Sequence, residues 1–221
     1  MKTMRRLVIC PIVILFLFVF VFRTEAQDPL RFEKEVEKVT SVAPTNKKDI
    51  IVFTGSSTIR MWKDIQTYFP SHNILNRGFG GSQTSDLIYY AEKLIVQYKP
   101  SQIFVYEGDN DLGSGKSKEV ILQDSQTLVE IIRSKLGSVP VVFITPKPSK
   151  ARRHLKENYE RYIEDLKRWA RTQKGVTVAD LWTPMLDEDG AVMQDIFLED
   201  GLHMNKKGYD IWAKAIGPLL R

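Results

Sequence analysis

Two short polar segments, far apart in the sequence, carry residues that could work together as a nucleophile and its base. Asp200 and His203 stand three residues apart near the C-terminus, and Ser56 and Ser57 follow an apolar run near the start of the chain. A serine hydroxyl is a poor nucleophile at neutral pH, so it needs a base within hydrogen-bond reach, and histidine can serve. A carboxylate on the other ring nitrogen selects the tautomer and stabilises the imidazolium. The residue types therefore predict a Ser-His-Asp triad with His203 as base and Asp200 as its orienting group.

The elements that must position these residues follow from the pattern of apolar runs. Short apolar runs separated by longer amphipathic segments predict five strands, at residues 50–53, 73–75, 103–106, 139–144 and 176–178. Helical patterns cover residues 82–98, 118–136, 155–172 and 206–220, and a surface helix over 28–39 precedes the first strand. Continuous apolar strands suit a parallel sheet that is covered on both faces. We therefore predict an α/β protein, a three-layer α/β/α sandwich around a five-stranded parallel sheet.

Polar blocks stand where these strands end, and in an open α/β sheet the ligand site lies at that edge. The blocks are residues 54–58, 76–82 and 107–111, and a fourth is the 200–203 segment before the last helix, which Asn205 can cap. Glycine amides such as that of Gly81, and the side-chain amide of Asn110, could hold the negative charge that develops on an ester oxygen. Taken singly, the serines could instead cap a helix, and Gly81 and Asn110 could belong to plain turns.

Together and in this order, the four blocks resemble the SGNH hydrolases, also called GDSL esterases and lipases. The resemblance covers nearly all of the chain from residue 27 onward. It implies a flavodoxin-like SGNH hydrolase fold and cleavage of carboxylic esters through an acyl-enzyme, without a cofactor. Carried over residue by residue, it implies a catalytic triad of Ser57, Asp200 and His203. It also implies an oxyanion hole made by Ser57, Gly81 and Asn110.

The first block departs from the family pattern at one position. The usual Gly-Asp-Ser is here Gly55-Ser56-Ser57. The register of the motif favours Ser57 as the nucleophile and leaves Ser56 as the alternative. Arg60 and Trp62 follow this block closely enough that either could line the substrate pocket.

Two other functions are possible in principle for such a chain. Residues 113–117 end like a phosphate-binding P-loop, but that motif requires glycine where this chain has Asn110, which disfavours nucleotide binding. A non-catalytic glycan-binding envelope protein could keep the same fold, although the complete set of Ser57, Asp200 and His203 argues against it. With three histidines, and no cysteine after residue 26, the sequence predicts neither a zinc site nor any other metal site.

The N-terminus has the pattern of an export signal. Basic residues precede an apolar run at residues 7–22, and small residues up to Ala26 suit a signal peptidase. We predict a signal peptide over 1–26 and one hydrolase domain over 27–221, with an uncleaved membrane anchor as the alternative. Cys10, the only cysteine, falls in the signal, so the domain must be stabilised by its core and not by disulfides.

The net charge and the length of the chain limit the kinds of partner and substrate that we expect. Loss of residues 1–26 removes +3 of the formal charge of +5, and a nearly neutral domain argues against nucleic acid as a partner. Export predicts a secreted or periplasmic protein that acts on a small-molecule or glycan ester and does not stay inserted in a membrane. A short chain without an obvious lid favours a small acyl group such as acetyl over the lipids or thioesters of lysophospholipase-type or thioesterase-type acylhydrolases. The sequence leaves the alcohol side of the ester and the oligomeric state open.

Overall fold

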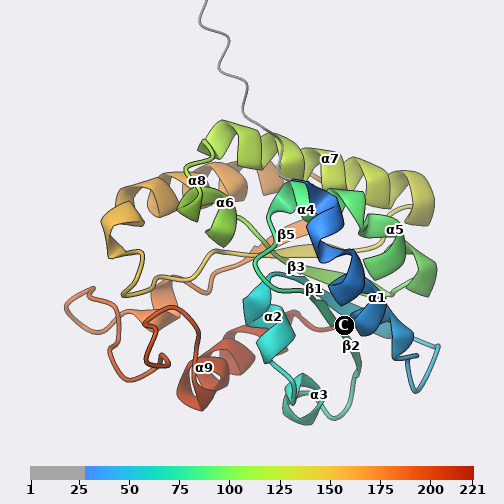
Figure 1. The fold of residues 1–221 in the computed structure, drawn as a ribbon, viewed down its shortest axis with the longest axis horizontal. Helices are drawn as coiled ribbons and strands as arrows, with labels where there is room; N and C mark the ends of the chain where they lie inside the picture. Colours follow the sequence, from blue (N-terminus) through green and yellow to red (C-terminus); the bar gives the residue numbers. More distant parts are fainter. Residues whose placement is uncertain (1–27) are drawn as a thin grey trace, which may run out of the picture.

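Five parallel strands form the centre of the protein, in the order β2-β1-β3-β4-β5 (Figure 1). This structure is a computed structural model, and it describes residues 28–221. The strands are β1 (Ile50–Gly55), β2 (Asn73–Gly78), β3 (Gln102–Tyr106), β4 (Val141–Ile144) and β5 (Val176–Ala179). The predicted three-layer α/β fold is confirmed, and its strand order is the flavodoxin-like one, in which ligands bind where the order reverses between β1 and β3.

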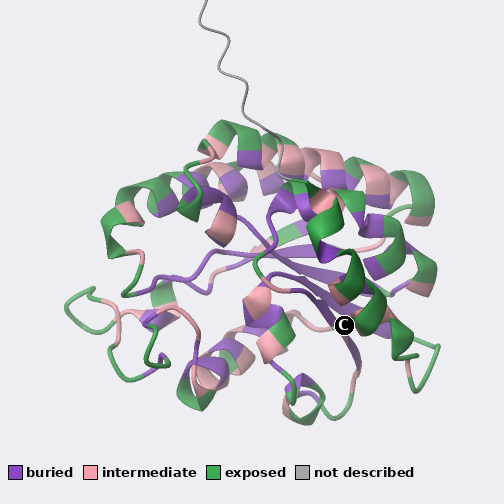
Figure 2. Cartoon of the chain, viewed as in Figure 1, coloured by how far each residue is buried: buried purple, intermediate pink, exposed green. Residues whose placement is uncertain are grey.

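Alternate residues of each strand pack against opposite helix layers. In β1, Ile50 and Val52 belong to one core cluster, and Ile51 and Phe53 belong to the other. The first layer contains α1 (Glu33–Ser41), α4 (Thr84–Tyr89), α5 (Ala91–Leu94), α7 (Lys118–Leu136) and α8 (Lys156–Ala170). The second contains α2 (Ser57–Met61), α3 (Ile65–Tyr68) and α9 (Lys206–Ile216). Strands β1, β3 and β4 are wholly buried between these layers, as their continuous apolar runs require, whereas the edge strands β2 and β5 are partly exposed (Figure 2).

Short helices complete the connections. They are α6 (Asp109–Gly113) and the 3-10 turns η1 (Pro29–Phe32), η2 (Val96–Tyr98), η3 (Arg153–Leu155), η4 (Thr183–Met185) and η5 (Gly217–Leu219). The helix expected over 82–98 is divided into α4, α5 and η2, because the backbone leaves helical geometry at Tyr90 and Ile95. Tyr90, Ile95 and Val96 are all buried in the core. The short helices α2, α3 and α6 were not predicted, since each is too short to show a helical period.

The register of the sheet brings three of the polar blocks side by side. Gly55 at the end of β1 pairs with Gly78 of β2 and with Tyr106 of β3. Gly55 has a φ of +122°, and a Cβ there would lie 2.0 Å from the carbonyl oxygen of Tyr106. The Ser56 amide donates to that same oxygen at 3.1 Å. Only glycine fits this approach of two strand ends, and Ser57 follows it by two residues.

The predicted signal peptide lies outside the described residues. Within residues 28–221, no helix is both long and apolar enough to cross a membrane.

Candidate active site

Ser57 and His203 come together across the sheet edge. Ser57 is half-buried at the first position of α2, and its Oγ lies 2.9 Å from Nε2 of His203. Ser56 precedes it at the N-cap, is 2% exposed, and does not cap the helix with its side chain. The structure therefore places the hydroxyl of Ser57, and not that of Ser56, against the imidazole.

Asp200 holds the other side of the His203 ring. Its Oδ2 lies 2.6 Å from Nδ1 of His203, and its Oδ1 accepts from the backbone amides of Leu202 and His203, both at 2.9 Å. Burial alone would raise the pKa of Asp200, but these hydrogen bonds outweigh it and lower the pKa to about 2. The carboxylate is thus charged at neutral pH, and it favours the tautomer in which Nε2 can accept a proton from Ser57.

The loop that carries this pair is fixed at both ends. Phe197 and Met204 form an isolated antiparallel bridge, and the Asn205 side chain binds the carbonyl of Asp195 while it caps α9, as the sequence predicted. The Tyr209 hydroxyl on α9 donates to the carbonyl of Thr58 on α2 at 2.9 Å. The helix after the base is therefore tied to the helix that starts with the nucleophile.

Three N–H groups lie at the same edge of the sheet. The side-chain nitrogen of Asn110 donates to the carbonyl of Ser82 at 2.9 Å, which joins the block after β3 to the block after β2. The backbone amides of Ser57 and Gly81 make no hydrogen bond to any residue of the 28–221 range. Gly81 has a φ of +73°, nothing lies within 4 Å of the position of a Cβ, and the residue is exposed. Such free donors can hold an oxyanion.

The Asn110 amide is oriented by a residue that the sequence interpretation missed. Arg152 donates to Oδ1 of Asn110 at 2.9 Å and to the carbonyl of Asp109 at 2.8 Å. Arg152 lies in the basic segment 150–156, and its guanidinium meets a buried acidic turn. The signal was present in the sequence, since a carboxylate at a buried strand end needs cations, and the basic residues after β4 are within reach.

The buried carboxylate of Asp109 holds the turn that carries Asn110. It is 4% exposed and is bound by Lys147 at 2.9 Å, by Arg152 at 2.5 Å and by the hydroxyl of Tyr106 at 2.7 Å. Burial alone would raise the pKa of Asp109, but the two cations dominate and hold it well below its ordinary value. The turn that presents Asn110 is thus held by a fully paired buried carboxylate.

The loop with Gly81 is held from α1. The Gly80 amide donates to Oε1 of Glu35 at 2.9 Å, and the same oxygen lies 3.2 Å from the guanidinium of Arg60. Nothing in the sequence near Glu35 signals this contact. The expectation that Trp62 could line the substrate pocket is wrong, because its ring is 0% exposed in the core.

The P-loop-like segment has a different context from the one that nucleotide binding needs. Residues 113–117 follow the helix α6 and not a strand, and Lys116 binds Asp111 at 2.8 Å and Asp124 at 3.1 Å. Its ammonium group is therefore occupied by carboxylates. Across residues 28–221, no group of three or more histidine, cysteine, aspartate or glutamate side chains is placed to hold a metal ion.

Comparisons with known proteins agree with this architecture. The family model described as "GDSL-like Lipase/Acylhydrolase family" matches residues 51–211. A GDSL-like lipase from Bacteroides thetaiotaomicron has a TM-score of 0.71 at 16% identity, with 87% of this chain and 98% of that chain covered. An acetyl-xylooligosaccharide esterase from Geobacillus Stearmophilus has a TM-score of 0.65 at 14% identity, covering 80% and 96%. A carbohydrate esterase family 3 protein from Talaromyces cellulolyticus has a TM-score of 0.63 at 18% identity, covering 77% and 95%. No curated protein sequence matches the chain.

Proposed function

Because the chain belongs to the GDSL-like lipase/acylhydrolase family, we propose that it is a serine esterase that cleaves carboxylic esters through an acyl-enzyme on Ser57. One observation carries the proposal, namely the unbroken chain of contacts from Ser57 Oγ to His203 at 2.9 Å and from His203 to Asp200 at 2.6 Å. A nucleophile, a base and an orienting group in hydrogen-bond contact are the parts that acyl transfer needs.

The proposed reaction has two steps. Ser57 Oγ attacks the ester carbonyl carbon and gives its proton to Nε2 of His203, and the carbonyl oxygen becomes an oxyanion that accepts hydrogen bonds from Ser57, Gly81 and Asn110. The tetrahedral species collapses, the bond to the leaving oxygen breaks, and His203 gives that oxygen the proton. Water then attacks the acyl-enzyme with His203 again as base, which releases the acid and restores the Ser57 hydroxyl.

A small acyl group is the proposed substrate. The neighbours named as an acetyl-xylooligosaccharide esterase and a carbohydrate esterase support it, and the predicted export would let the protein meet glycan esters outside the cytoplasm. With p-nitrophenyl esters, kcat/KM is expected to be highest for acetate and to fall by about tenfold or more for octanoate and longer chains. Faster cleavage of the long-chain esters would instead support a lysophospholipase-type activity, and preference for thioesters would support a thioesterase.

Arg152 is proposed to position the Asn110 amide for the oxyanion. Methionine at position 152 keeps much of the volume but removes the donors to Asn110, so the amide is free to turn away. We expect Arg152→Met to lower kcat for p-nitrophenyl acetate by about 10²-fold with a smaller change in KM, because the lost contact acts in the transition state.

Two controls separate positioning from a general structural loss. Arg153→Met changes the neighbouring exposed arginine and is expected to leave kcat unchanged. In an Asn110→Ala background, Arg152→Met should add little further loss, since the group that it positions is already gone. Additive losses in the double variant would show that Arg152 acts elsewhere.

A further inference from the structure

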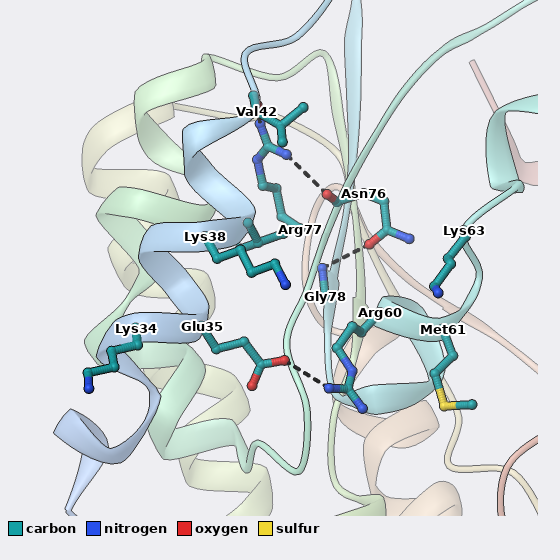
Figure 3. Close-up of a pocket in the computed structure, with 11 residues that line it drawn as sticks. Lys34, Glu35, Lys38, Val42, Arg60, Met61, Lys63, Asn76, Arg77 and Gly78 are labelled. Atoms are coloured by element: carbon teal, nitrogen blue, oxygen red, sulfur yellow. Dashed lines mark hydrogen bonds and ion pairs between the residues drawn. The ribbon is translucent and has the colours of Figure 1, made fainter.

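A cationic groove of about 900 Å³ lies beside the proposed active site, along the free edge of strand β2 (Figure 3). One wall is α1, which contributes Lys34 and Lys38. The other is α2 and the turn after it, with Met61 and Lys63. Residues 76–78 of the edge strand form the floor. The proposed triad does not use this groove.

The charged side chains that line the groove are mostly positive. Its lining includes five cationic side chains, namely Lys34, Lys38, Arg60, Lys63 and Arg77, against one carboxylate, Glu35. Arg60 and Glu35 bind each other, but the ammonium groups of Lys34, Lys38 and Lys63 make no hydrogen bond or ion pair with any described residue. Clefts lined by one sign of charge focus the electrostatic potential and attract ligands of the opposite sign.

Arg77 adds a positive charge at the floor that is not neutralised within the described fold. It is 2% exposed, and its guanidinium donates only to the backbone carbonyls of Val42 and Asn76 and lies 4.6 Å from the centre of the Tyr98 ring. Its Nε has no partner, and no carboxylate within residues 28–221 forms an ion pair with it. Buried charges are normally paired, so an anion in the groove would supply the missing counter-charge.

The unpaired cations of the groove are separate lysines, and this favours an extended anion over a single small one. A single phosphate is commonly held by an arginine fork or a helix N-terminus, but both arginines here are already bound to protein groups. The free cations are separate lysines, with Lys34 and Lys38 about 6 Å apart along α1 and Lys63 on the facing wall. Val39, Val42 and Met61 lie among them and offer aliphatic surface. Spaced ammonium groups around an apolar strip suit a sugar chain that repeats an anionic group and presents C–H ring faces.

Two residues of the groove contact the loop that carries Gly81. Arg60 follows Ser57 by three residues on α2, and a Cβ on Gly80 would lie 2.9 Å from its guanidinium. Glu35 on the other wall accepts the Gly80 amide, next to Gly81. The part of the groove at Arg60 therefore lies near the start of α2, where Ser57 stands.

We infer that this groove binds the alcohol side of the ester as an acidic polysaccharide, a chain bearing uronate-type carboxylates with an ester group presented to Ser57. The inference rests on the proposed esterase function and adds the class of leaving group. Lys34, Lys38 and Lys63 supply the charge, and the aliphatic strip contacts the rings.

The test is a binding measurement that needs no turnover. Purified protein with Ser57→Ala is titrated calorimetrically with an oligogalacturonate and with a neutral xylo-oligosaccharide of equal length. We expect the oligogalacturonate to bind at least about tenfold more tightly, and this preference to fall when salt is raised from about 0.05 M to about 0.5 M. Adding Lys34→Gln, Lys38→Gln and Lys63→Gln should weaken oligogalacturonate binding by about tenfold or more.

A second triple variant serves as a matched control, because it has the same net charge as the variant of the groove lysines. Lys93→Gln, Lys135→Gln and Lys174→Gln remove three exposed lysines that do not line the groove, and they should leave binding unchanged. Equal losses in both triple variants, no preference for the acidic chain, or tighter binding to vesicles of phosphatidylglycerol would each overturn the inference. If the oligogalacturonate binds but the unsubstituted protein hydrolyses no ester, the groove still binds acidic chains and the esterase proposal is wrong. If the protein hydrolyses esters but does not prefer the acidic chain, the esterase proposal stands and the inference about the groove is wrong.

Discussion

Ser57→Ala is expected to lower kcat for p-nitrophenyl acetate by about 10⁴-fold or more, which is the largest single effect that the structure predicts. The reason is that the Oγ of Ser57 is the atom in contact with Nε2 of His203, so its removal abolishes the covalent route. What activity persists would come from substrate binding and the remaining oxyanion donors. Initial rates, measured together with the thermal unfolding midpoint, separate this loss from misfolding.

Ser56→Ala is the matched control because it removes a hydroxyl one residue away. Ser56 is buried behind the nucleophile and its side chain does not cap α2, so this variant should keep its kcat within about tenfold. If Ser56→Ala were inactive and Ser57→Ala active, the motif register would be wrong. If both remained active, the chain would not be a serine hydrolase of this kind.

Asp200→Asn is expected to give the second large loss, about 10³-fold in kcat or more, with the fold intact. The backbone amides of Leu202 and His203 both donate to Oδ1 of Asp200, so the oxygen of the introduced amide should stay on that side. Its NH₂ group would then face Nδ1 of His203 and donate to it. That contact favours the tautomer with the proton on Nε2, which cannot accept the proton of Ser57.

The pH dependence of this carboxylate follows from its lowered pKa. Since the pKa of Asp200 in the folded protein is about 2, its hydrogen bonds to His203 and the amides contribute stability above the ordinary aspartate pKa of about 4. The contribution is lost as the pH falls through that ordinary value toward 2. Asp200 therefore stays ionised throughout the neutral range, and protonation of Asp200 should not cause a decline of kcat/KM between about pH 5 and pH 7.

Asp195→Asn serves as the control for Asp200→Asn. Asp195 is five residues earlier, on the same loop, and pairs with Lys207 at the exposed surface at 2.7 Å. Such a pair contributes little to stability, so this variant should match the unsubstituted protein in kcat and in unfolding midpoint. An Asp200→Asn variant with kcat within about tenfold of normal would contradict the orienting role.

The fold was predictable because its signals are local. Continuous apolar runs identify the strands, and glycine, serine and asparagine at the strand ends mark the edge where a site can form. The last helix was also predictable, since Asn205 caps it and its amphipathic pattern is regular. The division of residues 82–98 was not, because the apolar residues of this segment keep a helical period across the breaks at Tyr90 and Ile95.

The support around the proposed site depends on contacts between distant parts of the chain. Arg152 lies 42 residues from Asn110, and Glu35 lies 45 residues from Gly80. A carboxylate at a buried strand end signals that cations are needed, but no spacing or motif selects Arg152 among the basic residues of its segment, and none marks Glu35. The cationic groove also depends on tertiary structure. Lys38 on α1 and Lys63 after α2 line the same groove only because the fold places β2 at the edge of the sheet between them.

The most direct test of the central claim is the location of the covalent adduct. Purified protein is treated with a fluorophosphonate that reacts only with activated serines, digested, and sequenced by tandem mass spectrometry. A single phosphonylated residue is predicted, Ser57, and the modification should be lost in the His203→Gln variant because the hydroxyl is no longer activated. Modification of Ser56, or no modification of a protein that still hydrolyses p-nitrophenyl acetate, would contradict an acyl-enzyme on Ser57.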